Sequence, residues 1–132
     1  MEYTVGDIIA ERDVHLTRES LVRYAGASGD FNPIHYRDDV AASVGLPGVL
    51  AHGMLTMGIA SSVVVAALDA DARILDYGVR FTKPVVVDAE NGADVRVVAT
   101  VGAVDDTAAR IDLKVTFGEA TVLVKAQLRV AV

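Results

Sequence analysis

The sequence predicts one α+β domain over residues 1–132, in which a curved antiparallel β-sheet wraps around a long central apolar helix. Three observations favour this fold class. No Asp, Glu, Lys or Arg occurs between residues 46 and 68, so a helix there is apolar nearly all round and needs cover on several sides. Several runs after residue 72 alternate between apolar and polar side chains, as strands do. Short turns at 105–106 and 118–119 separate the last runs and indicate antiparallel neighbours.

The N-terminal part predicts a strand followed by a helix. Residues 8–16 alternate in part, which favours a strand. Thr17 is a good N-cap, and Glu19 lies in the first turn, where the helix dipole favours an acidic side chain. The helix is expected to end between Gly26 and Gly29, because glycine adopts backbone conformations at helix ends that other residues avoid.

A loop and a short helix are expected next. Pro33 cannot continue a helix and biases Asn32 toward an extended backbone, so residues 30–36 predict a loop. Asp38 is the expected N-cap of a short helix over residues 39–44.

The long apolar helix is expected over residues 52–68. From Gly53 to Leu68 it would be about 24 Å long, whereas a hydrocarbon core is roughly 30 Å thick. Asp69 and Asp71 follow it where a membrane span would carry basic residues. These features favour a buried helix and argue against a membrane span.

The C-terminal part predicts four strands, expected over residues 73–82, 92–104, 108–117 and 121–132. Pro84 stops the first of them. In the second, the odd-numbered positions from 95 to 101 are all apolar. A helix followed by a meander of this kind leaves one sheet edge and one face uncovered, so we expect the protein to dimerise.

The composition excludes several classes of function. The chain has no Cys, which rules out disulfides and thiol nucleophiles and favours a reducing compartment. A net charge of −6 argues against general nucleic-acid binding, which needs a basic surface. The N-terminal residues contain no basic segment followed by an apolar one, so no signal peptide is expected and we predict a cytoplasmic protein.

Asp30 and His35 are the candidate catalytic pair. A carboxylate accepts hydrogen bonds, and a neutral imidazole accepts on one nitrogen while it donates from the other. Five residues apart on a loop whose backbone Gly29 and Pro33 restrict, they could hold one water and move its protons near neutral pH. The same spacing also fits an Asx-turn beside a surface histidine. Asn32 is well suited to bond backbone groups across this loop.

Gly53 is the candidate oxyanion donor at the start of the long helix. Without a side chain, its N–H can closely approach a substrate oxygen, and a helix N-terminus favours developing negative charge. Taken alone, the position fits a simple helix-entry residue better. Ser61 lies eight residues further on the same helix face, where its hydroxyl could bond a polar group of the site or its own helix backbone.

A metal site is the alternative use of these residues. Asp30, His35 and His52 could form a two-histidine, one-carboxylate triad. However, His52 precedes Gly53 directly, so a metal and the oxyanion donor would compete for the same small space. We therefore expect no metal.

The run YAGASGDFNPIH, residues 24–35, resembles the hydratase signature of the MaoC-like family of (R)-specific enoyl-thioester hydratases and dehydratases. AHGM at residues 51–54 resembles the second motif of that family, and the likeness extends through RFTKP at residues 80–84. Residues 45–59 are most similar to the catalytic subunit of the actinobacterial (3R)-hydroxyacyl-ACP dehydratases, which pair with a second, related subunit.

This resemblance implies a hot-dog fold with Asp30 and His35 as the catalytic pair. It also implies that the Gly53 N–H is the thioester oxyanion donor and that Asn32 and Ser61 support substrate binding. The implied reaction is the reversible hydration of trans-2-enoyl thioesters in fatty-acid metabolism, most simply in fatty-acid elongation. It needs no cofactor, because it contains no redox step.

Several alternatives stay open at the level of the sequence. The chain could act as a hot-dog thioesterase, or as an acyl-thioester-binding structural subunit of a heterodimer. The acyl carrier could be CoA or an acyl-carrier protein, and the partner subunit another copy or a related hot-dog chain. Candidate cations for an acidic carrier protein are Arg23, Arg37, Arg80 and Lys83. Met57 and Ile59 are candidates for lining an acyl tunnel or for simple core packing.

Overall fold

The computed structural model describes residues 1–132. Its elements in chain order are β1 (Ile8–Leu16), α1 (Arg18–Ser28), a 3₁₀ turn η1 (Pro33–His35), α2 (Asp38–Ser43), α3 (Gly53–Val65), β2 (Ile74–Phe81), β3 (Ala93–Val104), β4 (Ala108–Phe117) and β5 (Ala120–Ala131). The expected bounds of β1 and β4 are confirmed, and those of the other strands and helices are shifted by no more than three residues.

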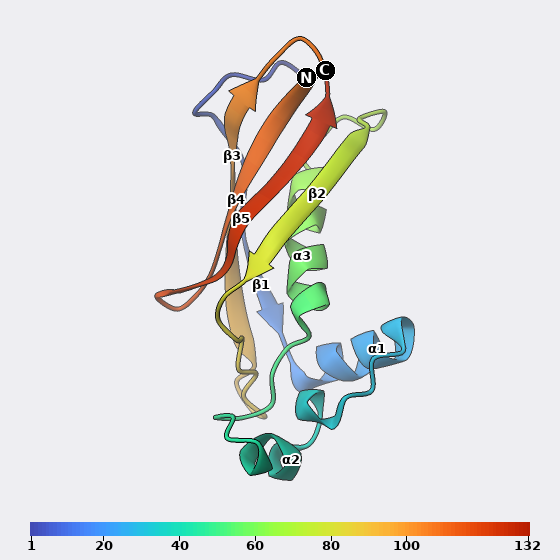
Figure 1. Cartoon of the computed structure of the whole chain (residues 1–132), viewed down its shortest axis with the longest axis vertical. Coiled ribbons are helices and arrows are strands. Elements are labelled where there is room, and N and C mark those ends of the chain that lie inside the picture. Colours follow the sequence, from blue (N-terminus) through green and yellow to red (C-terminus); the bar gives the residue numbers. More distant parts are fainter.

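The five strands form one antiparallel sheet in the order β1-β3-β4-β5-β2. Helix α3 runs along one face of this sheet, while α1 and α2 lie beyond the end at which α3 begins (Figure 1). The two chain termini lie next to each other at the opposite end. The predicted α+β arrangement of a twisted sheet around a central helix is therefore confirmed, and it is a hot-dog fold.

The expected meander is wrong for β2. Strands β3, β4 and β5 follow one another as hairpins, but β2 pairs with β5 on the far edge, with Tyr77 opposite Leu128. The connection over residues 82–92 is too long for a hairpin and crosses the molecule instead. On the way, Val86 forms a bridge with Leu50, so this connection pairs with the segment that leads into α3.

The core lies between the sheet and α3. The alternation in β3 is confirmed, since the four odd-numbered residues from Val95 to Val101 are buried while Asp94 and Arg96 on the other face are exposed. The side chains that meet them from α3 are Ala60, Val63 and Val64.

Helix α3 is covered on one side only, which corrects the expectation of cover on several sides. Its buried positions form a single stripe, Thr56, Ala60, Val63 and Val64. Met54 and Val65 are exposed although both are apolar. A single sheet of five strands covers one face of a helix, so the remaining apolar face of α3 is left without a partner within one chain.

Both ends of α1 follow the sequence signals. Thr17 caps the helix in a reciprocal capping box with Ser20, and Gly29 ends it in the left-handed conformation, φ 78°. The expected cap of α2 is wrong by one residue, because Arg37 occupies the N-cap position and Asp38 is the first helical residue. The Asp38 carboxylate instead accepts hydrogen bonds from the Arg18 guanidinium, at 2.9 Å and 3.3 Å, which ties α2 to α1.

Replacing Tyr77 with Phe is expected to lower the free energy of unfolding by about 1 kcal/mol. The Tyr77 hydroxyl donates a hydrogen bond of 2.7 Å to the Met57 carbonyl, and this bond joins edge strand β2 to α3. Burial raises the pKa of Tyr77 to about 12, so the hydroxyl stays protonated and keeps donating. Urea unfolding of both proteins measures the difference, and equal stabilities would contradict a stabilising role of this bond.

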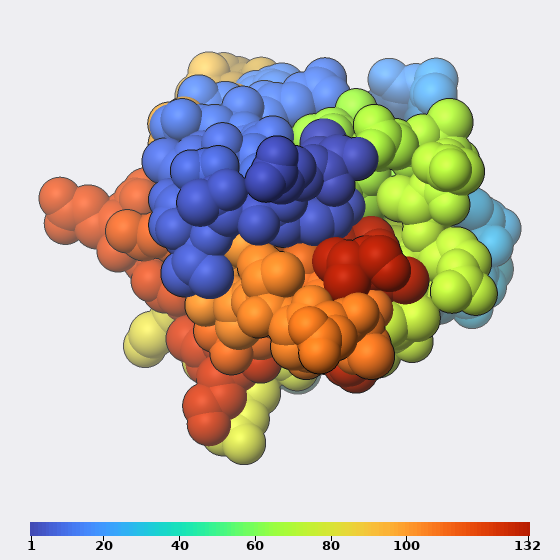
Figure 2. All heavy atoms as spheres, turned by 90° about the horizontal axis from the view of Figure 1, so that it is seen from above, coloured from blue at the N-terminus to red at the C-terminus, as the bar shows by residue number.

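The end of the molecule that holds the termini is closed by contacts between distant segments. The N-terminal residues, the β3–β4 turn and the C-terminus meet there (Figure 2). The Met1 amino group forms an ion pair with the Asp69 carboxylate, and the Gly6 N–H donates to the Val101 carbonyl at 2.8 Å. None of the helices combines the length and the apolar character needed to cross a membrane.

Candidate active site

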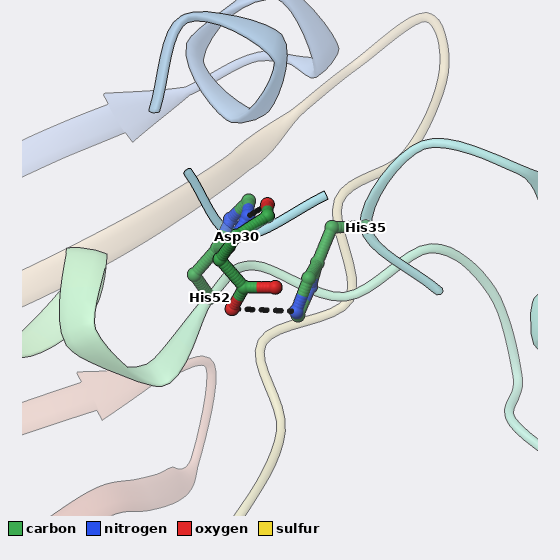
Figure 3. Close-up of side chains that lie close together, drawn as sticks. All are labelled: Asp30, His35 and His52. Carbon is green, nitrogen blue, oxygen red and sulfur yellow. Dashed lines mark hydrogen bonds and ion pairs between the residues drawn. The ribbon is translucent and has the colours of Figure 1, made fainter. Parts of the chain in front are cut away.

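Asp30 and His35 face each other from the loop between α1 and α2 (Figure 3). Asp30 Oδ2 lies 3.9 Å from His35 Nε2. The Asp30 side chain is 53% exposed, whereas the His35 side chain is almost fully buried. One partner is therefore open to solvent and the other is fixed by its surroundings, which suits a pair that receives a water or a substrate from outside.

Local hydrogen bonds shape this loop. Ser28 Oγ accepts from the Asp30 N–H at 3.1 Å, and Asp30 Oδ1 accepts from the Asn32 N–H at 3.1 Å. Asn32 Oδ1 accepts from the Ile34 N–H at 3.2 Å, and Pro33 is the first residue of the 3₁₀ turn, where its missing N–H costs nothing. The turn carries His35 back toward Asp30, and Oδ2 of Asp30 remains free to face it.

The tautomer of His35 follows from its other hydrogen bond. Its Nδ1 lies 2.7 Å from the Leu50 carbonyl oxygen. A carbonyl can only accept, so Nδ1 carries the proton and Nε2 of the neutral ring presents a lone pair. Two acceptors, Nε2 and the Asp30 carboxylate, then face the same space. A water molecule that donates one hydrogen to each of them satisfies both.

Gly53 begins α3, so its N–H is one of the first-turn donors that find no partner within the helix. A Cβ at this position would lie 3.0 Å from the nearest atom of the Phe81 ring, so only glycine leaves the space between ring and helix start free. A pocket of about 330 Å³ opens here. It is lined by His35, Leu50, Ala51, Gly53, Thr56, Phe81, Thr82, Lys83, Pro84, Val85, Val122 and Leu123.

The pocket thus brings the two stretches singled out in the sequence to one place. His35 comes from the loop and Gly53 from the helix start, and the bridge between Leu50 and Val86 holds the connecting segment. The pocket is large enough for part of a small ligand, has apolar walls, and contains few polar groups, as small-molecule sites generally do.

The two supporting residues expected from the sequence lie differently. Asn32 shapes the loop that carries Asp30 and His35, because its side chain accepts from the Ile34 N–H, and it does not line the pocket. Ser61 is not brought to the pocket either, because its hydroxyl donates to the Gly58 carbonyl of its own helix at 2.9 Å. Met57 and Ile59 are also absent from the lining and pack partly buried on α3.

Sequence reasoning missed Thr56 and understated Phe81. Thr56 is buried and lines the pocket one turn after Gly53. It follows Gly53 by three residues, and this helical spacing was the sequence signal that could have identified it. Phe81 reaches Gly53 only because β2 lies beside α3, and no local pattern encodes that contact. Of the candidate cations, Arg23 and Arg37 pair with Glu19 and Asp39, whereas Lys83 forms no ion pair and lines the pocket.

His52 lies behind the pair, with its imidazole 1% exposed. Its Nε2 donates to the Asp30 carbonyl at 3.1 Å, its ring stacks on His35 with centroids 3.8 Å apart, and the Tyr24 ring meets it edge-on at 4.8 Å. Burial lowers the pKa of His52, and the neighbouring His35 adds to this effect, although the hydrogen bond to Asp30 opposes it.

This packing bears on the metal alternative. Asp30, His35 and His52 each offer one ligand atom within 4.8 Å of the others. However, the two imidazole planes are inclined by only 22°, and a nitrogen lone pair lies in the plane of its ring. The lone pairs of the two rings therefore lie in nearly parallel planes and do not converge on one ion. This geometry fits ring stacking better than metal coordination.

Replacing Gly53 with Ala is expected to lower kcat/KM for the reaction of this site by about tenfold or more. The new methyl group would push against the Phe81 ring and narrow the approach to the helix-start N–H. Gly58→Ala is the matched control, because a Cβ there meets nothing within 4 Å. Steady-state kinetics should show normal turnover in the control, and an equally active Gly53→Ala would remove the oxyanion role.

Comparison with known proteins identifies relatives. The MaoC like domain family matches residues 4–122. The 3-hydroxyacyl-thioester dehydratase X of Mycobacterium tuberculosis is 40% identical over 82 residues, which are 60% of this chain and 27% of that protein. A structure described as a MaoC-like dehydratase has a TM-score of 0.89 at 31% identity, covering 99% of this chain and 40% of the other.

A two-chain structure is also similar. The ChsH1-ChsH2 complex from Mycobacterium tuberculosis has a TM-score of 0.87 at 19% identity, covering 98% of each chain. At that identity the likeness establishes the hot-dog fold alone. The chain spans only about a quarter of the curated relative given above and less than half of the MaoC-like dehydratase chain.

Proposed function

Because the chain belongs to the MaoC like domain family, we propose that it catalyses the reversible hydration of trans-2-enoyl thioesters to (3R)-3-hydroxyacyl thioesters. The observation that carries this proposal is the pair Asp30 and His35, which face each other across 3.9 Å beside the pocket that holds the start of α3. The relative that shares 40% identity is a 3-hydroxyacyl-thioester dehydratase, which supports the same reaction class. The (3R) configuration rests on the family likeness of the loop.

The pair supplies the proton transfers. A water bound between the Asp30 carboxylate and the His35 Nε2 lone pair attacks C3 of the enoyl group and forms the C3–O bond. One hydrogen stays on the new hydroxyl group, while the other passes to the pair as the O–H bond breaks. The pair then returns a proton to C2. Dehydration runs through the same steps in reverse.

The start of α3 supplies the electrostatic part. As C3 is attacked, electron density moves to the thioester oxygen, and the Gly53 N–H and the positive end of the helix dipole stabilise it there. No redox step occurs, so these protein groups suffice for the chemistry and no cofactor is invoked.

The acyl carrier is CoA or an acyl-carrier protein. Both are anionic, and Lys83 at the pocket is the cation placed to meet them, since it forms no ion pair within the chain. We place the reaction in fatty-acid metabolism. We also place it in the cytoplasm, because a chain without Cys suits a reducing compartment.

The protein is proposed to work as a hot-dog dimer, either of two copies or with a related chain. β2 is an edge strand with unpaired backbone groups, and apolar side chains of α3 and β2 stay exposed, among them Val65, Ile74 and Leu75. The two-chain complex named above shares the fold, which supports a partner of the same kind.

Replacing Val65 with Lys is expected to weaken this dimer by about tenfold or more, because the charge would have to be buried in an apolar interface. Val44→Lys makes the same change on the C-terminal side of α2, outside this face, and should leave assembly unchanged. Sedimentation equilibrium measures both. A parent protein with a mass of only 13.9 kDa in solution would contradict the homodimer and leave the mixed dimer.

The deciding experiment is a hydration assay of the purified protein with trans-2-enoyl-CoA substrates of several chain lengths. Loss of the conjugated-enoyl absorbance without release of free CoA is the expected result. Release of free thiol would identify a thioesterase instead. If the purified protein is inactive alone but becomes active when a related hot-dog subunit is added, the enzyme is a heterodimer of the two chains. A lack of hydratase activity with every partner would overturn the proposal.

A further inference from the structure

One buried titratable side chain takes no part in the proton transfers described above. His52 is less exposed than either member of the catalytic pair, and it is the N-cap residue of α3, directly before Gly53. It does not line the pocket. Its neighbours are nevertheless the groups on which the proposed reaction depends.

The first contact fixes the backbone of the catalytic aspartate. His52 Nε2 donates to the Asp30 carbonyl at 3.1 Å, across 22 residues of sequence. It therefore joins the catalytic loop to the start of α3. This bond also sets the tautomer, since a carbonyl only accepts, and it leaves Nδ1 as a buried nitrogen without a hydrogen-bond partner. A side chain kept for packing alone would not carry an unpaired polar atom, because such atoms are unfavourable in a core.

The second contact fixes the ring of the catalytic histidine. The His52 and His35 rings stack with centroids 3.8 Å apart, so His35 cannot turn about its side-chain bonds without losing this contact and its bond to Leu50. The groups around His52 are the Tyr24 ring from α1, the His35 ring from η1, and Asp30 in the loop. A proton on His52 would place positive charge against the His35 ring, one member of the pair that takes a proton from water.

We propose that His52 is a positioning residue: as a neutral imidazole it holds the Asp30 backbone and the His35 ring at the start of α3, so that the catalytic pair stays aligned with the Gly53 N–H. The kinetic part of this inference rests on the proposed hydratase function. The structural part, which concerns the tautomer and charge of His52, does not.

Two variants separate the two contacts. His52→Phe keeps a ring to stack on His35 and removes the unpaired nitrogen, but loses the donor to Asp30. His52→Gln keeps an N–H donor without the ring. We expect His52→Phe to fold normally and to lower kcat for enoyl-CoA hydration by about 10- to 100-fold with KM changed less than about threefold, because the lost interaction positions catalytic groups and does not bind substrate. His52→Gln should recover part of the lost turnover.

Val64→Ala is the control for a merely structural effect. Val64 lies fully buried on the same helix but does not line the pocket, so its truncation should lower the thermal midpoint and leave kcat unchanged. A His52→Phe protein with kcat within about twofold of the parent would overturn the positioning role.

Nitrogen NMR of the imidazole rings tests the structural part without any turnover. The expected spectrum has His52 protonated on Nε2 only, and the ring gains its second proton only below the ordinary histidine pKa, because burial lowers the pKa of His52. A proton on Nδ1 instead, or a ring that becomes charged at or above the ordinary histidine pKa, would overturn the inference. If the parent protein hydrates no thioester, the proposed function fails, and this spectrum still decides the state of His52.

Discussion

Replacing Asp30 with Asn is expected to lower kcat/KM for enoyl-thioester hydration by about 10²–10⁴-fold. The amide keeps the size of the side chain, and its oxygen can still accept from the Asn32 N–H, so the loop should keep its shape. What disappears is the second acceptor opposite His35. An amide NH₂ group in that place donates toward Nε2 and occupies the lone pair that a water would otherwise use.

Spectrophotometric kinetics on both proteins measure this loss, with thermal unfolding as the check on the fold. Stability should change little, because the Asp30 side chain is largely exposed. Asp39→Asn is the matched control, since it removes an exposed carboxylate from the nearby helix α2, where the side-chain partner of Asp39 is Arg37. Turnover of Asp30→Asn within about tenfold of the parent would mean that His35 alone handles the protons.

Removal of the imidazole at position 35 should have an effect of similar size. His35→Ala is expected to reduce hydration by about 10²–10⁴-fold, because no other side chain in the pocket lining can take a proton from water near neutral pH. The alanine would also leave the Leu50 carbonyl without its donor and open a space in a buried site, so some loss of stability is expected as well.

His35→Asn separates the two effects. Its amide NH₂ can still donate to Leu50, so it should restore stability without restoring activity. His15→Ala serves as the histidine control, because His15 is exposed on β1, pairs with Asp94 and does not line the pocket. Kinetics and urea unfolding of all four proteins give the result. An active His35→Asn would show that position 35 only supports the loop.

Local features of this molecule could be predicted from the sequence because neighbouring residues determine them. Thr17 and Gly29 mark the ends of α1, and the alternation of β3 matches its burial. Asp30 and His35 meet for the same reason, since one short loop with a proline-initiated turn carries both. The position of Gly53 at the helix start likewise follows from the apolar run that it opens.

Features that depend on distant segments could not be predicted in this way. Nothing within residues 74–81 specifies that β2 pairs with β5 instead of β3, because an alternating strand can pair with any neighbour of matching pattern. This placement of β2 brings Phe81 to Gly53, and a separate long-range contact joins His52 at the start of α3 to Asp30 in the loop. For Ser61 a local contact decides instead, because its hydroxyl donates a hydrogen bond to a carbonyl of its own helix and not to a group of the site.

The placement of the two chain termini has a practical consequence. They lie together at the end of the molecule that is remote from the start of α3, where the pocket opens (Figure 1). An affinity tag, a fluorescent reporter or a tethered carrier domain can therefore be attached at either terminus without obstructing the mouth of the pocket. Two such domains could also be joined by a short linker, because the tail of one and the head of the next start from the same side of the fold.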